Sequence, residues 1–362
     1  MKNPFTPSFG QVPLQMAGRT KIIKDMQTAF NNGIGDPNLC SLFTGVRGTG
    51  KTALLQLLAR QAEENGWISV SVTCVPEMLE DIYEQTIKKT KHLIESGSTT
   101  HIKSISVGQF LGVELERQNA PQLNWRSRMT DILDSLANLN TGLLITVDEV
   151  DPNLDEIVRL TTVYQHFVSE DRNVSLLMAG LPHRISTLLN GKSISFLRRA
   201  NRVKLGRISN ADVKIAFDQT VRLGGKEITN EALDEAALAI DGFPFMMQLI
   251  GYYAWEIAKN NVIENSDVKN GIAIAKEDME NRILEATLTE LSDRDIDFLK
   301  AMLEDEKLSR TTEIAARIGM STGNVSTYKK RLLEQGVIEE VRRGEVKFAL
   351  PYLREYLPKY CE

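Results

Sequence analysis

Eight consecutive residues, from Gly45 to Thr52, read GVRGTGKT and fit the pattern G-x-x-x-x-G-K-[ST]. Glycines at this spacing let a loop wrap its backbone N–H groups around phosphate oxygens. We expect Lys51 to reach the β- and γ-phosphates of a nucleotide and the Thr52 hydroxyl to bind Mg²⁺. The alternative is a glycine-rich turn without a ligand. The predicted phosphate-binding residues are Gly45, Gly48, Thr49, Gly50, Lys51 and Thr52.

A second segment whose residues could take part in chemistry is LLITVDE, from Leu143 to Glu149. An apolar strand that ends in two acids has few structural uses, because a buried carboxylate is costly without a partner. Beside a phosphate-binding loop, Asp148 would hold Mg²⁺ through water and Glu149 would polarise an attacking water as general base. The alternative is a strand followed by an acidic turn, since Asp151 also follows.

Three segments are expected to position these residues. Leu39–Phe43 is a short apolar run typical of a buried strand, and Thr52–Gln61 carries leucines at helical spacing. Ile68–Cys74 alternates and is rich in β-branched residues, which predicts another strand. The order strand, glycine loop, helix, strand predicts an α/β core of the P-loop NTPase type, with a parallel sheet between helices.

Composition and charge exclude several classes of protein. The 362 residues are 42% hydrophobic and 25% charged, which excludes collagen-like and wholly disordered chains. A net charge of −5 excludes a globally basic nucleic-acid coat, so any DNA contact must come from a local patch. Cys40, Cys74 and Cys361 form no CxxC pair, which argues against disulfides or zinc. With no membrane-length apolar run and no apolar leader, the sequence predicts a cytoplasmic protein without a membrane partner.

These motifs together resemble the AAA+ ATPases, most closely the initiator-like bacterial and archaeal ATPases related to origin-recognition proteins and to STAND ATPases. Ala17–Arg19, before a helix expected over Ile22–Phe30, is similar to a box that lies near the adenine in that family. Ser175–Gly180 resembles the strand whose end carries sensor 1, and Asp241–Pro244 resembles the turn of the helical lid. The resemblance covers residues 10–260 and implies ATP and Mg²⁺ as cofactors, with Gly18, Arg19 and Pro244 as further nucleotide-binding residues.

The same resemblance places an arginine finger in Phe196–Arg202, with Arg198 as first choice and Arg199 as second. Such a side chain stabilises transition-state charge on the nucleotide of a neighbouring subunit, which implies a homo-oligomer in the ATP state. The alternative is a solvated basic face, or structural pairing with acids.

Two positions depart from the family pattern. Ala179 or Gly180 stands at sensor 1, where many relatives carry Asn, Ser or Thr. Pro244 stands near the place where others have a sensor-2 arginine. Both departures favour a slow nucleotide switch.

Two further regions have a predicted structure: a hairpin between the glycine motif and the acidic motif, and a group of helices after them. Residues 96–123 predict a β-hairpin, which touches DNA or a partner in some relatives and is otherwise surface decoration. Helices are expected over Ala211–Leu223, Asn230–Ile240 and Phe245–Lys259, which would form a lid over the nucleotide.

The end of the chain is predicted to form a winged helix–turn–helix. Helices are expected over Asp293–Leu303, Thr311–Ile318 and Ser321–Leu333, followed by a hairpin with its tip at Arg342–Gly344. From residue 310 to the end there are ten Lys/Arg and seven Asp/Glu. Candidate phosphate contacts are Arg310, Lys329, Lys330, Arg331, Arg342, Arg343 and Lys347; candidate base contacts are Ser321, Thr322, Asn324, Ser326 and Thr327.

The sequence thus predicts three parts: an AAA+ core over residues 1–206, a helical lid over 207–286 and a winged helix over 287–362. The leading hypothesis is a Mg²⁺-dependent ATPase that binds duplex DNA under nucleotide control. The alternative is a STAND-like signalling switch whose winged helix docks a protein partner.

Overall fold

The computed structural model describes residues 2–8, 10–96 and 124–361, and a five-stranded parallel sheet forms the centre of its α/β core. The strand order is β2-β3-β4-β1-β5. The strands are β1 (Cys40–Thr44), β2 (Ile68–Thr73), β3 (Leu143–Asp148), β4 (Val174–Gly180) and β5 (Asn201–Lys204). This sheet confirms the predicted α/β core of the P-loop NTPase type. The hairpin predicted over 96–123 lies, from residue 97 onward, outside the described residues.

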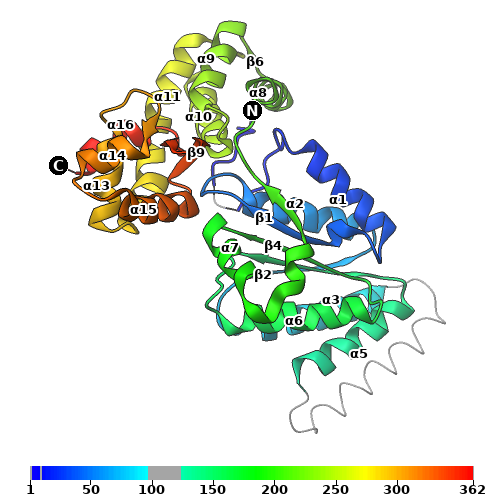
Figure 1. The fold of residues 1–362 in the computed structure, drawn as a ribbon. Helices are drawn as coiled ribbons and strands as arrows, with labels where there is room; N and C mark the ends of the chain where they lie inside the picture. The colour runs from blue at the N-terminus through cyan, green and yellow to red at the C-terminus, as the bar shows by residue number, and fades with distance from the viewer. Residues whose placement is uncertain (1, 9, 97–123, 362) are drawn as a thin grey trace.

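Helices cover both faces of the sheet, so the core has three layers (Figure 1). Successive strand residues face opposite layers, as Leu42 and Phe43 of β1 do. Phe43 packs on the layer of α1 (Thr20–Asn32) and α2 (Lys51–Glu64). Leu42 faces the layer formed by α3 (Met78–Ser96), α5 (Trp125–Asn138), α6 (Asp155–Ser169), α7 (Pro182–Asn190) and the 3₁₀ segment η2 (Lys192–Arg199).

The first βα unit differs slightly from its predicted bounds. Leu39 belongs to a short 3₁₀ turn, η1 (Pro37–Leu39), because Asp36 caps that turn with a side-chain bond to the Asn38 N–H. Helix α2 begins one residue earlier and ends three residues later than predicted, at Lys51 and Glu64.

A helical lid follows the core. It contains α8 (Asn210–Gly224), α9 (Asn230–Ile240), α10 (Pro244–Ile257) and α11 (Asn265–Met279), with a small parallel pair β6 (Glu227–Ile228) and β7 (Val262–Ile263) that the sequence did not predict. Ser209 and Thr229 cap α8 and α9 with their side-chain oxygens. Helix α11 continues through a π-helical turn, η3 (Glu280–Leu284), into α12 (Glu285–Thr289).

The N-terminal segment is anchored in this lid. The Phe5 ring is buried 4.9 Å from the ring of Phe217, and Gly251 leaves room for it because a Cβ there would overlap the Phe5 ring. The Thr6 N–H donates to Gln248 Oε1 at 2.9 Å, which fixes the path of the chain toward the core.

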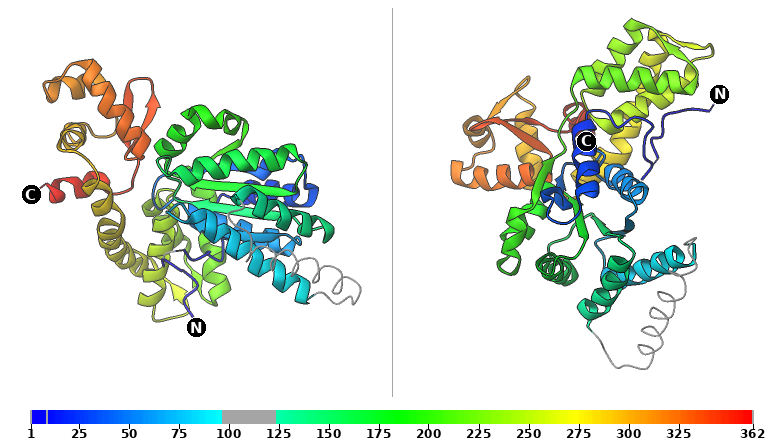
Figure 2. Two further views of the ribbon diagram at one scale, coloured as in Figure 1. Left: turned by 90° about the horizontal axis from the view of Figure 1, so that it is seen from below. Right: turned by 90° about the vertical axis from the view of Figure 1, so that its right-hand side faces the viewer.

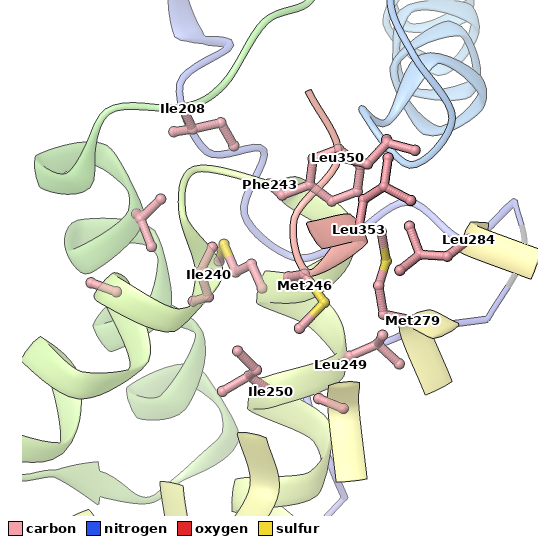
Figure 3. Packing of buried hydrophobic residues seen from close by; sticks show 14 of the residues in the cluster. Ile208, Ile240, Phe243, Met246, Leu249, Ile250, Met279, Leu284, Leu350 and Leu353 are labelled. Carbon is pink, nitrogen blue, oxygen red and sulfur yellow. The ribbon is translucent and has the colours of Figure 1, made fainter. Parts of the chain in front are cut away.

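The C-terminal unit combines helices with a small antiparallel sheet whose strand order is β8-β10-β9. Its elements are α13 (Asp293–Met302), β8 (Ser309–Arg310), α14 (Thr311–Arg317), α15 (Thr322–Gln335), β9 (Ile338–Arg342), β10 (Glu345–Phe348) and α16 (Leu353–Tyr360). It packs beside the lid (Figure 2), and the two share one apolar core. Leu350 and Leu353 lie next to Met279 and Leu284 in that core (Figure 3).

The part of the chain that the structure describes has no helix both long and apolar enough to span a bilayer.

Candidate nucleotide site

The loop from Gly45 to Gly50 joins β1 to α2, and its glycines are required by close contacts. Gly50 has φ 84° at the N-terminus of α2, and a Cβ at Gly48 would lie 2.6 Å from the Phe243 ring. Lys51 Nζ donates to the carbonyls of Gly45 and Val46, each at 3.1 Å. The loop therefore places backbone N–H groups, a helix N-terminus and an ammonium group together, the arrangement that suits a phosphate chain.

Lys51 is buried, and two acids lie near enough to act on its charge. Loss of hydration lowers the pKa of its ammonium group, an effect that the negative charges of Glu149 and Asp148 oppose and that the Arg47 guanidinium reinforces. Because the described lining places no carboxylate against Lys51 as an ion-pair partner, this buried cation is well suited to an anionic ligand.

The two acids at the end of β3 lie beside α2. Thr52 Oγ1 donates to Asp148 Oδ2 at 2.5 Å, and the Glu149 N–H donates to Asp148 Oδ1 at 2.9 Å. A hydroxyl and a carboxylate side by side supply the oxygen ligands that Mg²⁺ prefers, so Thr52 and Asp148 fit the predicted ion. Glu149 has φ 53°, a left-handed conformation uncommon outside glycine, and this turns its exposed side chain onto the cavity.

A cavity of about 480 Å³ opens over these residues, between the core, the lid and the N-terminal segment. Of the predicted nucleotide-site residues, eight line it: Arg19, Gly48, Thr49, Gly50, Lys51, Thr52, Glu149 and Pro244. Gly45 and Asp148 lie behind this wall, bonded to Lys51 and Thr52 respectively. Gly18 lies beside Arg19, where a Cβ would come within 2.8 Å of Ile208 Cγ2.

Arg19 is a buried cation in the wall of this cavity. Its Nη2 donates to the Gly206 carbonyl at 2.9 Å, and burial lowers the pKa of its guanidinium. The bond ties the N-terminal segment to the connection between core and lid.

The lid is fixed to the phosphate-binding loop by backbone contacts. The Phe245 N–H donates to the Gly48 carbonyl at 3.2 Å, and Pro244 lies next to Gly50. At the end of β4, Ala179 and Gly180 are buried and offer no side-chain polar group, as the sequence indicated.

The two finger candidates lie away from the cavity of their own chain. Arg198 Nε donates to the Leu189 carbonyl at 3.1 Å, and Arg199 is exposed beside it. Among the described residues, no ion pair joins Arg198, Arg199 or Arg202 to a carboxylate. Pairing with acids is therefore not seen, and a finger or a basic face remain as predictions.

In the C-terminal unit, most of the predicted phosphate contacts are paired with acids of the same unit. Lys329 binds Glu340 at 2.5 Å, Arg342 binds Glu345 at 2.5 Å, and Lys347 binds Glu339 at 3.0 Å. The looser pairs are Arg310 with Glu345 at 3.6 Å and Lys330 with Glu334 at 3.8 Å. Arg343 is exposed with no ion pair among the described residues, and Asn324 and Thr327 are exposed on α15.

Arg331 has a structural contact that its sequence position does not suggest. Its guanidinium binds both carboxylate oxygens of Asp295, at 2.9 and 2.5 Å, and Asp295 is 1% exposed. Asp295 closes the capping box of α13 with Ser292. Replacing Arg331 would therefore leave the buried Asp295 carboxylate without its ion-pair partner, with only the Ser292 hydrogen bonds to hold its charge, and the residue is a poor choice for testing DNA contact.

The phosphate-binding loop also touches the C-terminal part of the chain. Arg47 Nη2 binds Glu290 Oε1 at 2.6 Å, and Val46 packs so closely on Gly336 that no Cβ fits there. His183 Nδ1, at the start of α7, lies 3.0 Å from the Glu334 carbonyl. These contacts were not foreseen, because they join residues that are 150 to 290 positions apart.

Several lining residues likewise carried no sequence signal. They come from the N-terminal segment, from α10 and from the helix that leaves the lid: Thr6, Gln11, Gln15, Phe245, Gln248, Arg282, Ile283 and Ala286. They belong to no motif and reach the cavity only through tertiary packing.

Comparison with known proteins agrees with this geometry. Residues 36–189 match a family described as an AAA domain, and residues 281–357 match a domain of unknown function, DUF8462. No curated protein matches the chain.

Among solved structures, the Walker-type ATPase PABY2304 of Pyrococcus abyssi is similar, with a TM-score of 0.69 and 15% identity over 94% of this chain and 95% of that one. Cdc6p of Pyrobaculum aerophilum has a TM-score of 0.51 at 14% identity, covering 98% of this chain and 96% of its own. ORC2 of Aeropyrum pernix, solved as ADPNP–ADP complexes, has a TM-score of 0.51 at 13% identity, covering 98% and 95%. Residues 36–189 thus match an AAA domain, and the chain has the fold of P-loop nucleoside triphosphatases.

Proposed function

We propose that this protein is a Mg²⁺-dependent ATPase whose nucleotide state sets the position of a C-terminal winged helix that binds duplex DNA. The observation that carries the proposal is the direct contact of Val46 and Arg47, in the phosphate-binding loop, with Gly336 and Glu290. A nucleotide that shifts the loop would strain or release these contacts, and this is how we propose that the site and the C-terminal unit are coupled.

Each residue of the site has a role in this proposal. Lys51 neutralises the phosphate chain, and Thr52 with Asp148 holds the ion that the nucleotide brings. That ion, when bound, offsets the charge that develops on the phosphates. Glu149, exposed on the cavity and close enough to affect Lys51, accepts the proton of the attacking water.

We propose that residues 287–362 form a winged helix, which the order of their helices and strands supports. In that fold the third helix, α15, is presented to DNA. Its N-terminal half carries exposed polar groups, including Asn324 and Thr327, that can reach base edges. Arg343, at the tip between β9 and β10, is exposed and has no ion pair among the described residues, so its guanidinium is available to a phosphate.

The salt dependence of duplex DNA binding tests this part of the proposal. Each neutralised phosphate contributes about 0.9 to the slope of log affinity against log salt. Replacing Lys330 and Arg343 together by alanine should flatten the slope by up to about two units and weaken binding to all sequences alike. Both residues lie on the surface with weak or no ion pairs, so the fold should survive.

The matched control removes two cations from the lid, the half-buried Lys214 and the exposed Arg222, which lie on α8 and are paired with Asp234 and Asp218. It should leave the slope unchanged. A parent protein whose DNA affinity does not respond to salt would end the DNA hypothesis.

A second candidate function is docking of a protein partner by the same unit. The specific observation in its favour is the pairing of Lys329, Arg342 and Lys347 with acids, which leaves a surface of mixed charge. If this alternative is correct, the C-terminal unit should still bind its protein partner at a salt concentration that releases DNA.

We further propose that the ATP state assembles into a homo-oligomer, in which Arg198 or Arg199 reaches the nucleotide of a neighbour. The exposure of Arg199 and the absence of carboxylate partners for both side chains among the described residues support this.

A further inference from the structure

The helix that leaves the lid passes across the mouth of the nucleotide cavity. Arg282, Ile283 and Ala286 line the cavity from this helix, and Glu290, one turn further, binds Arg47 of the phosphate-binding loop at 2.6 Å. Residues 282, 286 and 290 are spaced by four, so they follow one face of the helix. That face is turned to the nucleotide site.

A π-helical turn sets this orientation. The Glu285 N–H donates to the Glu280 carbonyl, a bond that spans five residues and widens the turn. Met279 and Leu284, also five apart, are both fully buried and point into the core shared with the C-terminal unit (Figure 3). The wide turn keeps both of them in the core while Arg282 stays on the cavity side. Turns of this kind occur frequently at functional sites.

Arg282 is the cavity cation with the weakest hold on its present partner. Arg19 donates to the Gly206 carbonyl from a buried position, and Arg47 is neutralised by Glu290. Within the described parts of the chain, the one ion pair of Arg282 is with Asp278, one turn away at 2.9 Å, and the Arg282 side chain is 48% exposed. Exposed pairs of this spacing contribute little, whereas a guanidinium bound to phosphate forms short, charge-assisted bonds.

Asp278 would keep a hydrogen-bond partner if the Arg282 side chain moved away. The Tyr253 hydroxyl donates to the same carboxylate oxygen at 2.7 Å, so Asp278 keeps a hydrogen bond. The start of α10 offers no cation to the nucleotide, because Pro244 and Phe245 stand there. Among the lining residues that the structure describes, Arg282 is therefore the cation on the lid side of the cavity.

We propose that Arg282 is a phosphate-binding residue. When a nucleotide binds, the Arg282 guanidinium breaks its ion pair with Asp278 and contacts the phosphate chain in its own subunit. This rests on the proposed function and deepens it. Because Arg282 belongs to the helix that runs into the C-terminal unit, its bond to phosphate would tie that unit directly to the nucleotide. The bond would favour nucleotides with more phosphate charge.

Titration calorimetry with ATP, ADP and adenosine, with Mg²⁺ present, tests the inference on the full chain. Arg282→Ala should weaken ATP binding about tenfold, ADP less, and adenosine hardly at all. Asp278→Asn should strengthen ATP binding severalfold, because it weakens the competing pair. The double variant should behave as Arg282→Ala alone.

Arg222→Ala is the matched control, because Arg222 forms the same kind of pair with Asp218 at 2.8 Å, on α8 outside the cavity. It should bind all three ligands as the parent does. Parent-like ATP affinity in Arg282→Ala, or an equal loss for ATP and adenosine, would overturn the inference.

Failure of the inference can be told from failure of the proposed function. If Lys51→Ala loses ATP while Arg282→Ala does not, the site stands and only the role of Arg282 falls. If the parent binds no ATP, both fall.

Discussion

Replacing Lys51 by alanine should lower ATP affinity by a factor of about 10² to 10³, the largest effect of any single change in the site. Lys51 is the buried ammonium of the site, whereas the other cation of the loop, Arg47, is already paired with Glu290. Its hydration is already lost in the folded protein, so removing it should cost little stability. Calorimetry measures the affinity, and thermal melting with and without ATP should show that the stabilisation by ligand is gone.

The chain offers a closely matched control for this variant. Lys226 donates to the carbonyls of Trp255 and Ala258, at 2.9 and 2.7 Å, much as Lys51 donates to two carbonyls of its loop. It lies in the lid outside the cavity lining. Lys226→Ala should therefore keep ATP affinity, and unchanged affinity in Lys51→Ala would show that the loop is not a nucleotide site.

Replacing Glu149 by glutamine should leave ATP bound and reduce turnover by a factor of about 10² to 10⁴, since an amide of similar shape cannot take the proton of the attacking water. The same left-handed backbone at φ 53° suits either side chain equally. Single-turnover phosphate release measures the effect. Asp151→Asn is the control, because Asp151 is a nearby acid that caps the Asn153 N–H and does not line the cavity.

The Glu149→Gln variant also serves to test the proposed homo-oligomer. If Arg198 acts on a neighbour, mixing Arg198→Ala with Glu149→Gln subunits should restore part of the activity, since one interface then joins an intact base to an intact finger. If activity is not restored by mixing and does not rise with protein concentration, the basic-face interpretation of Arg198 and Arg199 holds.

The sequence predicted the parts of the fold that depend on local patterns. The loop Gly45–Thr52 and the strand Leu143–Asp148 were recognisable because in each case a motif stands next to an apolar stretch of sequence. Helices α9 and α13 began at the predicted residues, because Thr229 and Ser292 cap them.

What the sequence missed depends on contacts between distant segments. Arg331 looked like a surface cation for DNA, yet Asp295, 36 residues earlier, binds it from a buried position. Arg282 belongs to no motif and lies on the cavity only because a π turn and the packing of Met279 and Leu284 orient it. The contact between Val46 and Gly336 spans most of the chain and has no local pattern at all.

The central claim is that nucleotide at the phosphate-binding loop controls the C-terminal unit. The most direct measurement is the affinity of the Glu149→Gln protein for random duplex DNA in Mg-ATP, in Mg-ADP and without nucleotide. We expect the ATP and ADP states to differ by a factor of at least about five, a typical coupling between two sites, and Lys51→Ala to show no nucleotide effect. The same salt-dependent affinity in all three states would contradict the coupling, and no binding in any state would contradict the role in DNA.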